Sequence, residues 1–371
     1  MNPQIETSFG QRFRVADFAS LISLATLMLV FSVVATDFVS FGTVTLVLKQ
    51  GAVLAIVATG LTFVLLCAEI DLSVGMVALL SACLCGVAWE SSFAAGPKEA
   101  NGVANVSFMT TAIVILLPLL IAVLLGLISG WLTVSSGLPS FIITLAMMNI
   151  ALGLARFLTR SQKFAVPSVL TQLGNGRVFE VDFHRFGKLI VPQSALVAAV
   201  VLVAAHLVLQ HTRFGRYVYM TGGNRQAARL AGVRTERIVI ACLAICALTS
   251  ACGGMITAGR MNGVTLDQNA DLLLDAVACV VLGGTSLFGG EGGIGRTLVG
   301  VLSFTVLKVG LNLTNVEYLI KKSPLSAGLK EAWLKASWVT QFDLLRPFLL
   351  GIVLMFALVI HGRLVKHRND S

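Results

Sequence analysis

Apolar runs of about 20 residues limit the folds open to this chain more than any other feature. A helix needs roughly that length to cross the hydrocarbon core of a bilayer, where it must satisfy its own backbone polar groups. Only 12% of the residues are charged, against about 25% in typical soluble proteins, and the mean hydropathy is +0.89. The sequence therefore predicts an all-α membrane protein.

The apolar runs predict about ten transmembrane helices. The predicted segments are residues 18–34, 45–67, 72–89, 112–134, 141–158, 195–209, 238–258, 272–287, 297–313 and 347–360. The eighth and the tenth hold fewer than about 18 clean apolar residues, the usual lower limit for a span. Each of these two is therefore open to interpretation as a re-entrant or a tilted segment.

The orientation follows from the basic residues, which favour cytoplasmic loops. The densest cluster lies in the loop 212–237, with Arg213, Arg216, Arg225, Arg229, Arg234 and Arg237. With this loop in the cytoplasm, ten spans place both termini there too, in agreement with the basic residues near each end. We predict a cytoplasmic tail over 1–17, a single transmembrane domain over 18–363 and a second cytoplasmic tail over 364–371.

The segment 317–346 does not fit this pattern, because ten spans place it outside although it carries four lysines. Leu329, Trp333 and Leu334 recur at helical spacing, which favours a short amphipathic helix over 329–339 at the membrane interface. A solvated loop anchored by Trp333 and Trp338 explains the same residues equally well. We therefore predict that 317–346 is a periplasmic insertion, and the sequence does not decide between a helix and a loop there.

Composition also argues against several functions. The net charge of +9 follows the membrane topology rather than forming a patch for nucleic acid. All seven cysteines lie in apolar stretches, as small buried residues do, and they predict no disulfide framework and no metal site. The histidines show no catalytic pairing, so we expect no catalytic residue, no cofactor and no enzyme activity.

The glycine-rich run 283–295 resembles a phosphate-binding loop only superficially. It has Arg296 where such a loop has lysine, and apolar segments flank it where a strand and a soluble domain are needed. Small residues that let helices approach, or let the chain turn sharply, explain the run better.

Charged residues near apolar segments are candidates for function in a membrane protein. They are Lys49, Glu69, Asp71, Arg156, Asp275 and Lys308. We interpret Glu69 and Asp71 as a helix boundary, with Asp71 capping the third span, rather than as a buried pair. Asp275 is a candidate for the solute pathway or another cap, and the polar Asn149 within the fifth span is a second pathway candidate.

Four blocks of sequence resemble the bacterial sugar permeases of the ribose and xylose importer type. They are GLTFVLLCAEIDLSVG (60–75), LPSFIITLAMMNIALG (138–153), TRFGRYVYMTGGNRQAARLAGV (212–233) and LLLDAVACVVLGGTSLFGG (272–290), in the order of that family. The chain differs from the family pattern at Glu69, where glycine is usual, and in the long connection 317–346. The first difference bears on the identity of the solute and the second on partner docking.

The resemblance implies the permease subunit of an ATP-driven (ABC) importer in the bacterial inner membrane. Its implied partners are a cytoplasmic ATP-binding subunit, a second permease subunit, identical or not, a periplasmic solute-binding protein and membrane lipid. It also implies that the loop 222–233 holds a short coupling helix for the ATP-binding subunit. The coupling residues are then Gly223, Asn224, Arg225, Ala227, Ala228, Arg229, Leu230 and Gly232.

The composition of this loop suits such a helix, since Asn224 is a good N-cap and Gly232 a good C-terminal stop. We expect Ala227 and Ala228 to permit close approach of the partner, and Arg225 and Arg229 to pair with its acidic residues. Two alternatives remain. An ion-coupled secondary transporter would use broken helices and intramembrane acids, and a channel would show a repeated filter sequence, which is absent here.

Overall fold

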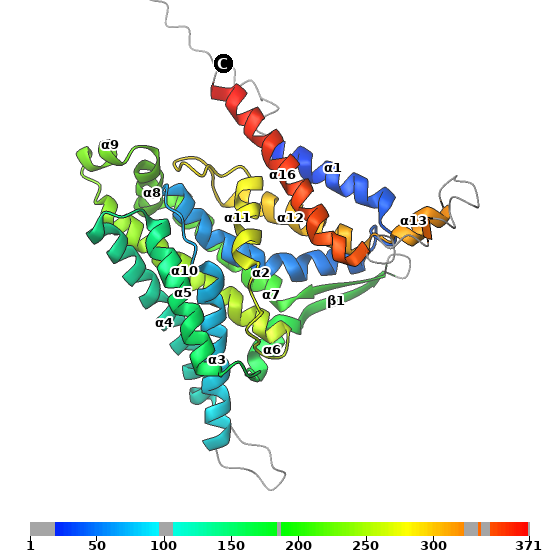
Figure 1. Cartoon of the computed structure of the whole chain (residues 1–371), viewed down its shortest axis with the longest axis horizontal. Coiled ribbons are helices and arrows are strands. Elements are labelled where there is room, and N and C mark those ends of the chain that lie inside the picture. Colours follow the sequence, from blue (N-terminus) through cyan, green and yellow to red (C-terminus); the bar gives the residue numbers. More distant parts are fainter. Residues whose placement is uncertain (1–18, 96–106, 184–186, 323–332, 335–341, 370–371) are drawn as a thin grey trace, which may run out of the picture.

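The computed structural model describes residues 19–95, 107–183, 187–322, 333–334 and 342–369, and most of them are helical (Figure 1). The elements are α1 (Ala19–Val34), α2 (Phe41–Leu66), α3 (Val74–Ala95), α4 (Phe108–Ser136), α5 (Ser140–Thr159), α6 (Ser168–Asn175), β1 (Arg177–Phe183), β2 (Gly187–Pro192), α7 (Gln193–His211), α8 (Arg213–Gly223), α9 (Arg225–Leu230), α10 (Thr235–Arg260), α11 (Leu272–Leu282), α12 (Ile294–Leu313), α13 (Val316–Lys322) and α16 (Phe342–Asn369).

Each of the ten predicted segments overlaps one long or apolar helix, namely α1 to α5, α7, α10 to α12 and α16. Within the described residues, seven of these helices are long and apolar enough to cross a membrane: α2, α3, α4, α5, α7, α10 and α12. The apolar parts of α1 and α16 are shorter. At about 1.5 Å per residue, α11 with its 11 residues is also too short for a hydrocarbon core of about 30 Å.

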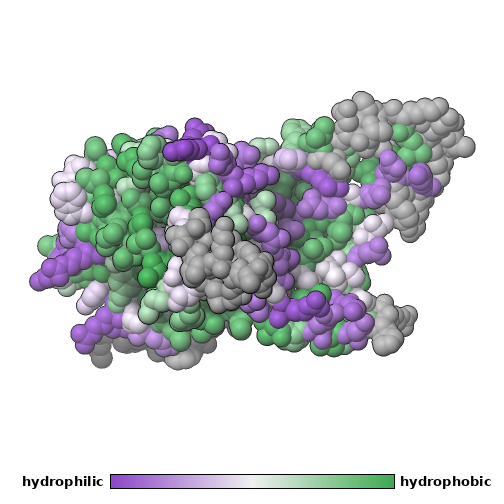
Figure 2. Space-filling view, turned by 90° about the horizontal axis from the view of Figure 1, so that it is seen from below, coloured by the Kyte–Doolittle hydropathy of each residue, from purple (hydrophilic) through white to green (hydrophobic). Residues whose placement is uncertain are grey.

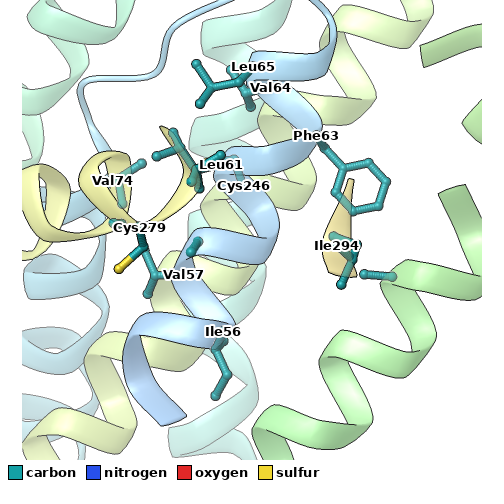
Figure 3. Close-up of a cluster of buried hydrophobic side chains, with 14 of the residues drawn as sticks. Ile56, Val57, Leu61, Phe63, Val64, Leu65, Val74, Cys246, Cys279 and Ile294 are labelled. Atoms are coloured by element: carbon teal, nitrogen blue, oxygen red, sulfur yellow. The ribbon is translucent and has the colours of Figure 1, made fainter. Parts of the chain in front are cut away.

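The centre of the bundle is the antiparallel pair of α2 and α10. Arg260, at the end of α10, donates a hydrogen bond of 3.4 Å to the carbonyl of Lys49 near the start of α2. At the other end of the pair, the sulfurs of Cys67 and Cys242 are 3.3 Å apart. Figure 3 shows the α2 side chains among residues of α3, α10, α11 and α12. An apolar helix buried on all sides needs no amphipathic stripe, which is why both helices read as continuous apolar runs.

The connections between the long helices gather at two opposite ends of the bundle (Figure 1). At one end, the α2–α3 and α4–α5 connections meet through a hydrogen bond of 2.9 Å from the Ile70 amide to Ser140 Oγ, and the α7–α10 loop lies beside them. At the other end, the carbonyl of Gly259 accepts a hydrogen bond of 3.1 Å from Asn175 Nδ2. Successive long helices therefore run alternately between the two ends.

A β-hairpin corrects the all-α prediction. β1 and β2 pair antiparallel, with Phe179 opposite Val191 and Val181 opposite Leu189, in a region that we had treated as a loop between spans. Alternating β-branched and aromatic residues favour a strand. The hairpin is held to α2, because the Phe183 and Phe41 rings stack with centroids 4.4 Å apart.

Wide apolar areas lie on the face of the bundle that Figure 2 shows, beside polar ones. α4 illustrates this best, since large apolar side chains on its outer face are exposed, among them Phe108, Leu116, Leu120 and Trp131. Contiguous apolar surface of this kind marks contact with lipid or with another protein. The cores beneath it are formed by small and apolar residues of neighbouring helices.

Two predictions fall wholly or partly outside the described residues. The structure describes only residues 316–322, 333–334 and 342–346 of the predicted insertion and its flank, so the amphipathic helix over 329–339 stays a prediction. The N-terminal tail over 1–17 lies outside them as well. At the other end, α16 continues to Asn369, past the predicted start of the C-terminal tail at 364.

Candidate functional site

The loop that joins α7 to α10 carries two short helices at one end of the bundle (Figure 1). Asn224 caps the second of them, α9, since its side-chain oxygen accepts a hydrogen bond of 2.9 Å from the Ala227 amide. Gly232, just after α9, has a φ of +83°, a conformation that glycine adopts without steric cost at a helix end. The predicted cap and stop of this helix are thus confirmed.

One face of α9 is buried in the protein and the other is exposed. Ala228 is 1% exposed and belongs to the main core cluster. Leu230, two residues later, is 92% exposed. We expected Ala228 to permit close approach of a partner, but its side chain packs into the interior of this chain. Within residues 223–230, the exposed residues are Gly223, Asn224, Gln226, Ala227, Arg229 and Leu230.

Arg225, at the start of α9, forms an ion pair with Glu69 in the α2–α3 connection. Its guanidinium also donates a hydrogen bond of 3.4 Å to the carbonyl of Cys67. Glu69 is only 8% exposed, and a carboxylate so placed needs a partner because burial removes its water. The pair therefore fixes α9 to the end of α2.

Arg229 likewise has its partners in this chain. It forms an ion pair of 2.7 Å with Glu236 and donates a hydrogen bond of 3.1 Å to Thr235 Oγ1, at the start of α10. Both groups of the ion pair are well exposed, so it contributes little to stability. Both arginines are thus paired within this chain, and their pairing with acids of another subunit stays a prediction.

Close backbone contacts join this loop to the glycine-rich loop between α11 and α12. The Gly290 amide donates a hydrogen bond of 3.0 Å to the carbonyl of Leu66, the last residue of α2. A Cβ on Gly222 would lie 1.8 Å from that same carbonyl oxygen, and a Cβ on Gly290 would lie 2.7 Å from the Gly223 Cα. These distances allow only glycine, so three segments meet here backbone to backbone.

A cavity of about 380 Å³ lies beside α9 at the same end. It is lined by the charged side chains of Glu69, Arg225, Arg229 and Glu236 and by the α4–α5 turn. The end of the bundle therefore presents an exposed apolar side chain next to a charged recess. Such a combination suits recognition of a protein surface more than chemistry on a small molecule.

Asp71 lies at the helix boundary that we predicted, but it is buried. It is 3% exposed and accepts hydrogen bonds from the Ser73 amide at 2.8 Å and the Ser73 hydroxyl at 2.6 Å, just before α3. Burial raises the pKa of the Asp71 carboxyl, and the bonds from Ser73 oppose this shift. Glu69 and Asp71 thus mark the predicted boundary and do not pair with one another, but each is buried with a partner of its own, Arg225 and Ser73 respectively.

A second candidate site lies toward the opposite end, among α2, α10, α11 and α12. Asp275 of α11 forms an ion pair of 2.7 Å with Lys308 of α12. This pair lines a polar cavity of about 280 Å³ together with Gln50 of α2 and Arg260 of α10. Sequence reasoning named Asp275 as a pathway residue and Lys308 only as a charged residue near an apolar segment, and it did not name Gln50 or Arg260.

Asn149 is not part of this cavity. Its side chain donates a hydrogen bond of 2.9 Å to the carbonyl of Leu145, one turn earlier in α5. It is exposed on the outside of the bundle, near the exposed Ile150. The structure therefore does not bring the two predicted pathway residues together.

The glycine-rich run lies between two apolar helices, and the element directly before it is the helix α11 and not a strand. Five of its glycines have positive φ: Gly284, Gly289, Gly290, Gly292 and Gly293. The run is thus the sharp turn that we predicted. Over the described ranges, no group of three or more His, Cys, Asp or Glu side chains is placed to hold a metal ion.

Comparison with known proteins shows that this chain is similar to transport permeases. Residues 43–358 match the family model for the permease component of the branched-chain amino acid transport system. None of the solved structures matches the chain.

Three curated relatives are similar over most of their length. The ribose import permease RbsC of Escherichia coli (strain K12) is 32% identical over 305 residues, which cover 80% of this chain and 86% of the relative. The fructose import permease FrcC of Rhizobium meliloti is 31% identical over 298 residues, 80% of this chain and 78% of the relative. The probable ABC transporter permease YphD of Escherichia coli (strain K12) is 32% identical over 305 residues, 81% and 83% respectively.

Proposed function

Because this chain belongs to the family of branched-chain amino acid transport permease components, we propose that it is the membrane-spanning subunit of an ATP-driven importer for a sugar or a sugar-like polar solute. Similarity over 80% of the chain to permeases for ribose and fructose is the observation that carries this proposal. Members of this family are transport subunits of the inner membrane and not enzymes. ATP is then hydrolysed by a separate cytoplasmic subunit, and a periplasmic protein delivers the solute.

The end of the bundle that carries α9 faces the cytoplasm in this proposal. The cluster of arginines in 212–237 supports this orientation, because basic residues favour cytoplasmic loops. The β-hairpin and α6, at the opposite end, then face the periplasm. All ten apolar helices enter the membrane, the domain extends over 18–363 and both tails lie in the cytoplasm.

The docking element for the ATP-binding subunit is α9 with its flanking residues. Leu230 supports this role, because its apolar side chain is 92% exposed at the end of a well-formed helix. Such a side chain can become buried in a groove of a partner protein. Gln226 and Ala227 are exposed on the same short helix. Ala228 and Arg225 act from the inner side and hold the helix in place.

Transmission of the signal requires an element whose position both subunits influence. The Glu69–Arg225 pair and the Gly222–Leu66–Gly290 contact join α9 to α2 and to the α11–α12 loop. A displacement of α9 by the ATP-binding subunit is thereby passed to helices that surround the polar cavity. This continuity of contacts supports coupling through α2, α11 and α12.

A second permease subunit completes the pathway in this proposal. The outward-facing position of Asn149 on α5 supports this view, since one polar side chain among exposed apolar residues suits a pathway shared with another subunit. The apolar face of α4 is then available to lipid. Asp275 lies on the wall of the internal cavity.

One observation favours an ion-coupled secondary transporter as the other candidate. The short α11 with its intramembrane Asp275 resembles the broken helices of such proteins. Uptake by proteoliposomes separates the two functions. With the ATP-binding subunit, the binding protein and internal ATP, we expect uptake of a labelled neutral sugar that a proton or sodium ionophore does not stop. Uptake that needs an ion gradient and no ATP would contradict the proposal.

A further inference from the structure

The chain between α10 and α11 turns back into the bundle before α11 begins. A Cβ on Gly254 of α10 would lie 2.1 Å from the carbonyl oxygen of Ala78 in α3. Gly254 and Ala78 are therefore at the same depth below the end of the bundle that carries the hairpin. Asn269 lies deeper still, because its carbonyl oxygen would be 2.9 Å from a Cβ on Gly75, three residues before Ala78 in α3. Gly254 itself is six residues, or about 9 Å at 1.5 Å per residue, before the end of α10 at Arg260.

α11 therefore starts inside the bundle, as a half-helix with its N-terminus directed toward the end that carries the hairpin. The residues just before it, 267–271, have the polar sequence Asp-Gln-Asn-Ala-Asp. Irregular polar backbone at membrane depth is tolerated where it is buried in protein or lines a water-filled cavity. The cavity of about 280 Å³ lies against this very segment.

Most of the residues that line the cavity are polar, and they carry charges of both signs. Asp267, Asp271 and Asp275 carry the acidic groups, and Arg260 and Lys308 carry the basic groups. The charges nearly cancel, so the cavity is not suited to hold an isolated anion or several cations. The Asp275–Lys308 pair places a hydrogen-bond acceptor beside a donor, at 2.7 Å from one another.

An amide of the lining has unused hydrogen-bonding capacity. Gln268 is 4% exposed, and its Nε2 donates to the sulfur of Met261 at 2.9 Å and to the carbonyl of Gly263 at 3.4 Å. Its side-chain oxygen has no partner among the described residues. A buried oxygen without a partner costs free energy, which a hydroxyl of a ligand in the cavity would recover once the Gln268 side chain turned its oxygen toward the cavity.

We propose that this cavity binds one small, neutral, polyhydroxylated solute during transport, an inference that rests on the proposed function. Neighbouring hydroxyls of such a molecule both donate and accept, so they match the carboxylate of Asp275, the ammonium of Lys308 and the amides of Gln50 and Gln268. The volume is below the range of about 300 to 1,000 Å³ typical of drug-sized ligands, which suits a single sugar-sized molecule. The positive end of α11 favours the oxygens of the solute.

Protection of an introduced cysteine tests binding directly. Gln50→Cys in the purified permease should react with a small polar thiol reagent, because Gln50 lines the cavity and is partly exposed. D-Ribose, D-xylose and D-fructose are the probes, and at least one of them should slow the reaction about tenfold if the site is nearly saturated, since protection follows occupancy. The control Glu180→Cys, on the exposed hairpin, should react at the same rate with and without sugar.

Transport kinetics supply the second test. Asp275→Asn together with Lys308→Met removes both charges at once, which avoids an unpaired buried charge. We expect this double variant to assemble normally and to raise the KM for uptake about tenfold, equal to about 1.4 kcal/mol. The matched control Glu180→Gln, which alters an exposed ion pair, should keep the KM of the wild type.

The outcomes separate the two proposals. If the wild type shows ATP-dependent uptake of a sugar, while Gln50→Cys is not protected and the double variant keeps the wild-type KM, the cavity is no solute site and only this inference fails. If the wild type takes up none of the three sugars, the proposed sugar import fails and this inference fails with it. Protection together with a raised KM supports both.

Discussion

Arg225, the first residue of α9, forms an ion pair with Glu69 in the α2–α3 connection. A loop at the end of the bundle is thus attached by charge to the central helix α2. Glu69 is 8% exposed, whereas the Arg225 side chain is 40% exposed. The two partners of this pair therefore differ in how much water they lose, and so in the effect of removing each.

The first prediction is an asymmetry between Arg225→Ala and Glu69→Ala. Loss of Arg225 leaves a buried carboxylate without its partner, which costs about 3–5 kcal/mol when both groups are fully buried; because Arg225 is partly exposed, we expect a smaller loss, about 1–3 kcal/mol. Loss of Glu69 removes the buried charge itself and should cost less. Thermal unfolding of the purified permease measures both.

The exposed Arg229–Glu236 pair is the matched control. Glu236→Ala should change stability by no more than about 1 kcal/mol, as for other exposed pairs. The double exchange Glu69→Arg with Arg225→Glu re-forms the ion pair in the opposite sense. It should therefore keep more solute-stimulated ATP hydrolysis than Glu69→Arg or Arg225→Glu alone. If Glu69→Ala were the more damaging single variant, the pair would not act as described.

The second prediction separates the two faces of α9. Leu230→Asp places a charge on a side chain that is 92% exposed, so the permease should remain as stable as the wild type while association with the ATP-binding subunit weakens. Ala228→Leu enlarges a buried residue and should destabilise the permease itself by about 1–3 kcal/mol. Co-purification and thermal unfolding, measured on both variants, distinguish these effects. Equal loss of stability in both would refute the assignment of faces.

The third prediction concerns the contact of the two loops. Gly290→Ala brings a Cβ to 2.7 Å from the Gly223 Cα at a φ of +73°, and strain of this kind costs about 1–3 kcal/mol. Gly295→Ala is the control, since nothing lies within 4 Å of a Cβ there. We expect Gly290→Ala to lower solute-stimulated ATP hydrolysis and Gly295→Ala to leave it unchanged. A normal coupling ratio in Gly290→Ala would exclude this contact from the transmission path.

The helices could be predicted from sequence because the membrane imposes long apolar runs, and all ten predicted segments overlap a helix. The cap at Asn224 and the stop at Gly232 could be predicted because local hydrogen bonds determine them. The hairpin was missed because its two strands are short and mostly exposed or half-buried, so neither forms a long apolar run. The role of Glu69 was missed because its partner is 156 residues away, a contact that local spacing does not reveal.

The same limitation explains the errors about the acids. The sequence context of Asp71 predicted a helix cap but not its burial, which comes from the packing of α5 and α10 around the α2–α3 connection. The pairing of Asp275 with Lys308 joins two predicted spans, and their opposite charges were the one available signal. Asn149 was chosen for polarity alone, and polarity does not tell which side of α5 faces outward.

The fourth prediction is the orientation of the bundle. In intact cells, a cysteine at Asp182 in the hairpin should react with a thiol reagent that does not cross membranes, while one at Ala227 in α9 should react only after permeabilisation. The native cysteines give little background, since six of the seven are buried and the seventh is partly buried. Reaction of Ala227→Cys from outside would reverse the proposed topology.

The attachment of a separate ATP-binding subunit to α9 is the central claim, and one cross-linking measurement tests it most directly. Leu230→Cys, with a short thiol-reactive cross-linker, should join this chain to the ATP-binding subunit in the assembled importer, while Glu180→Cys on the hairpin should not. The yield at Leu230→Cys should change when ATP binds, since coupling requires that α9 respond to the nucleotide state. If Leu230→Cys gave no cross-link and reacted with a soluble reagent as fast in the complex as in the permease alone, α9 would not be the docking element.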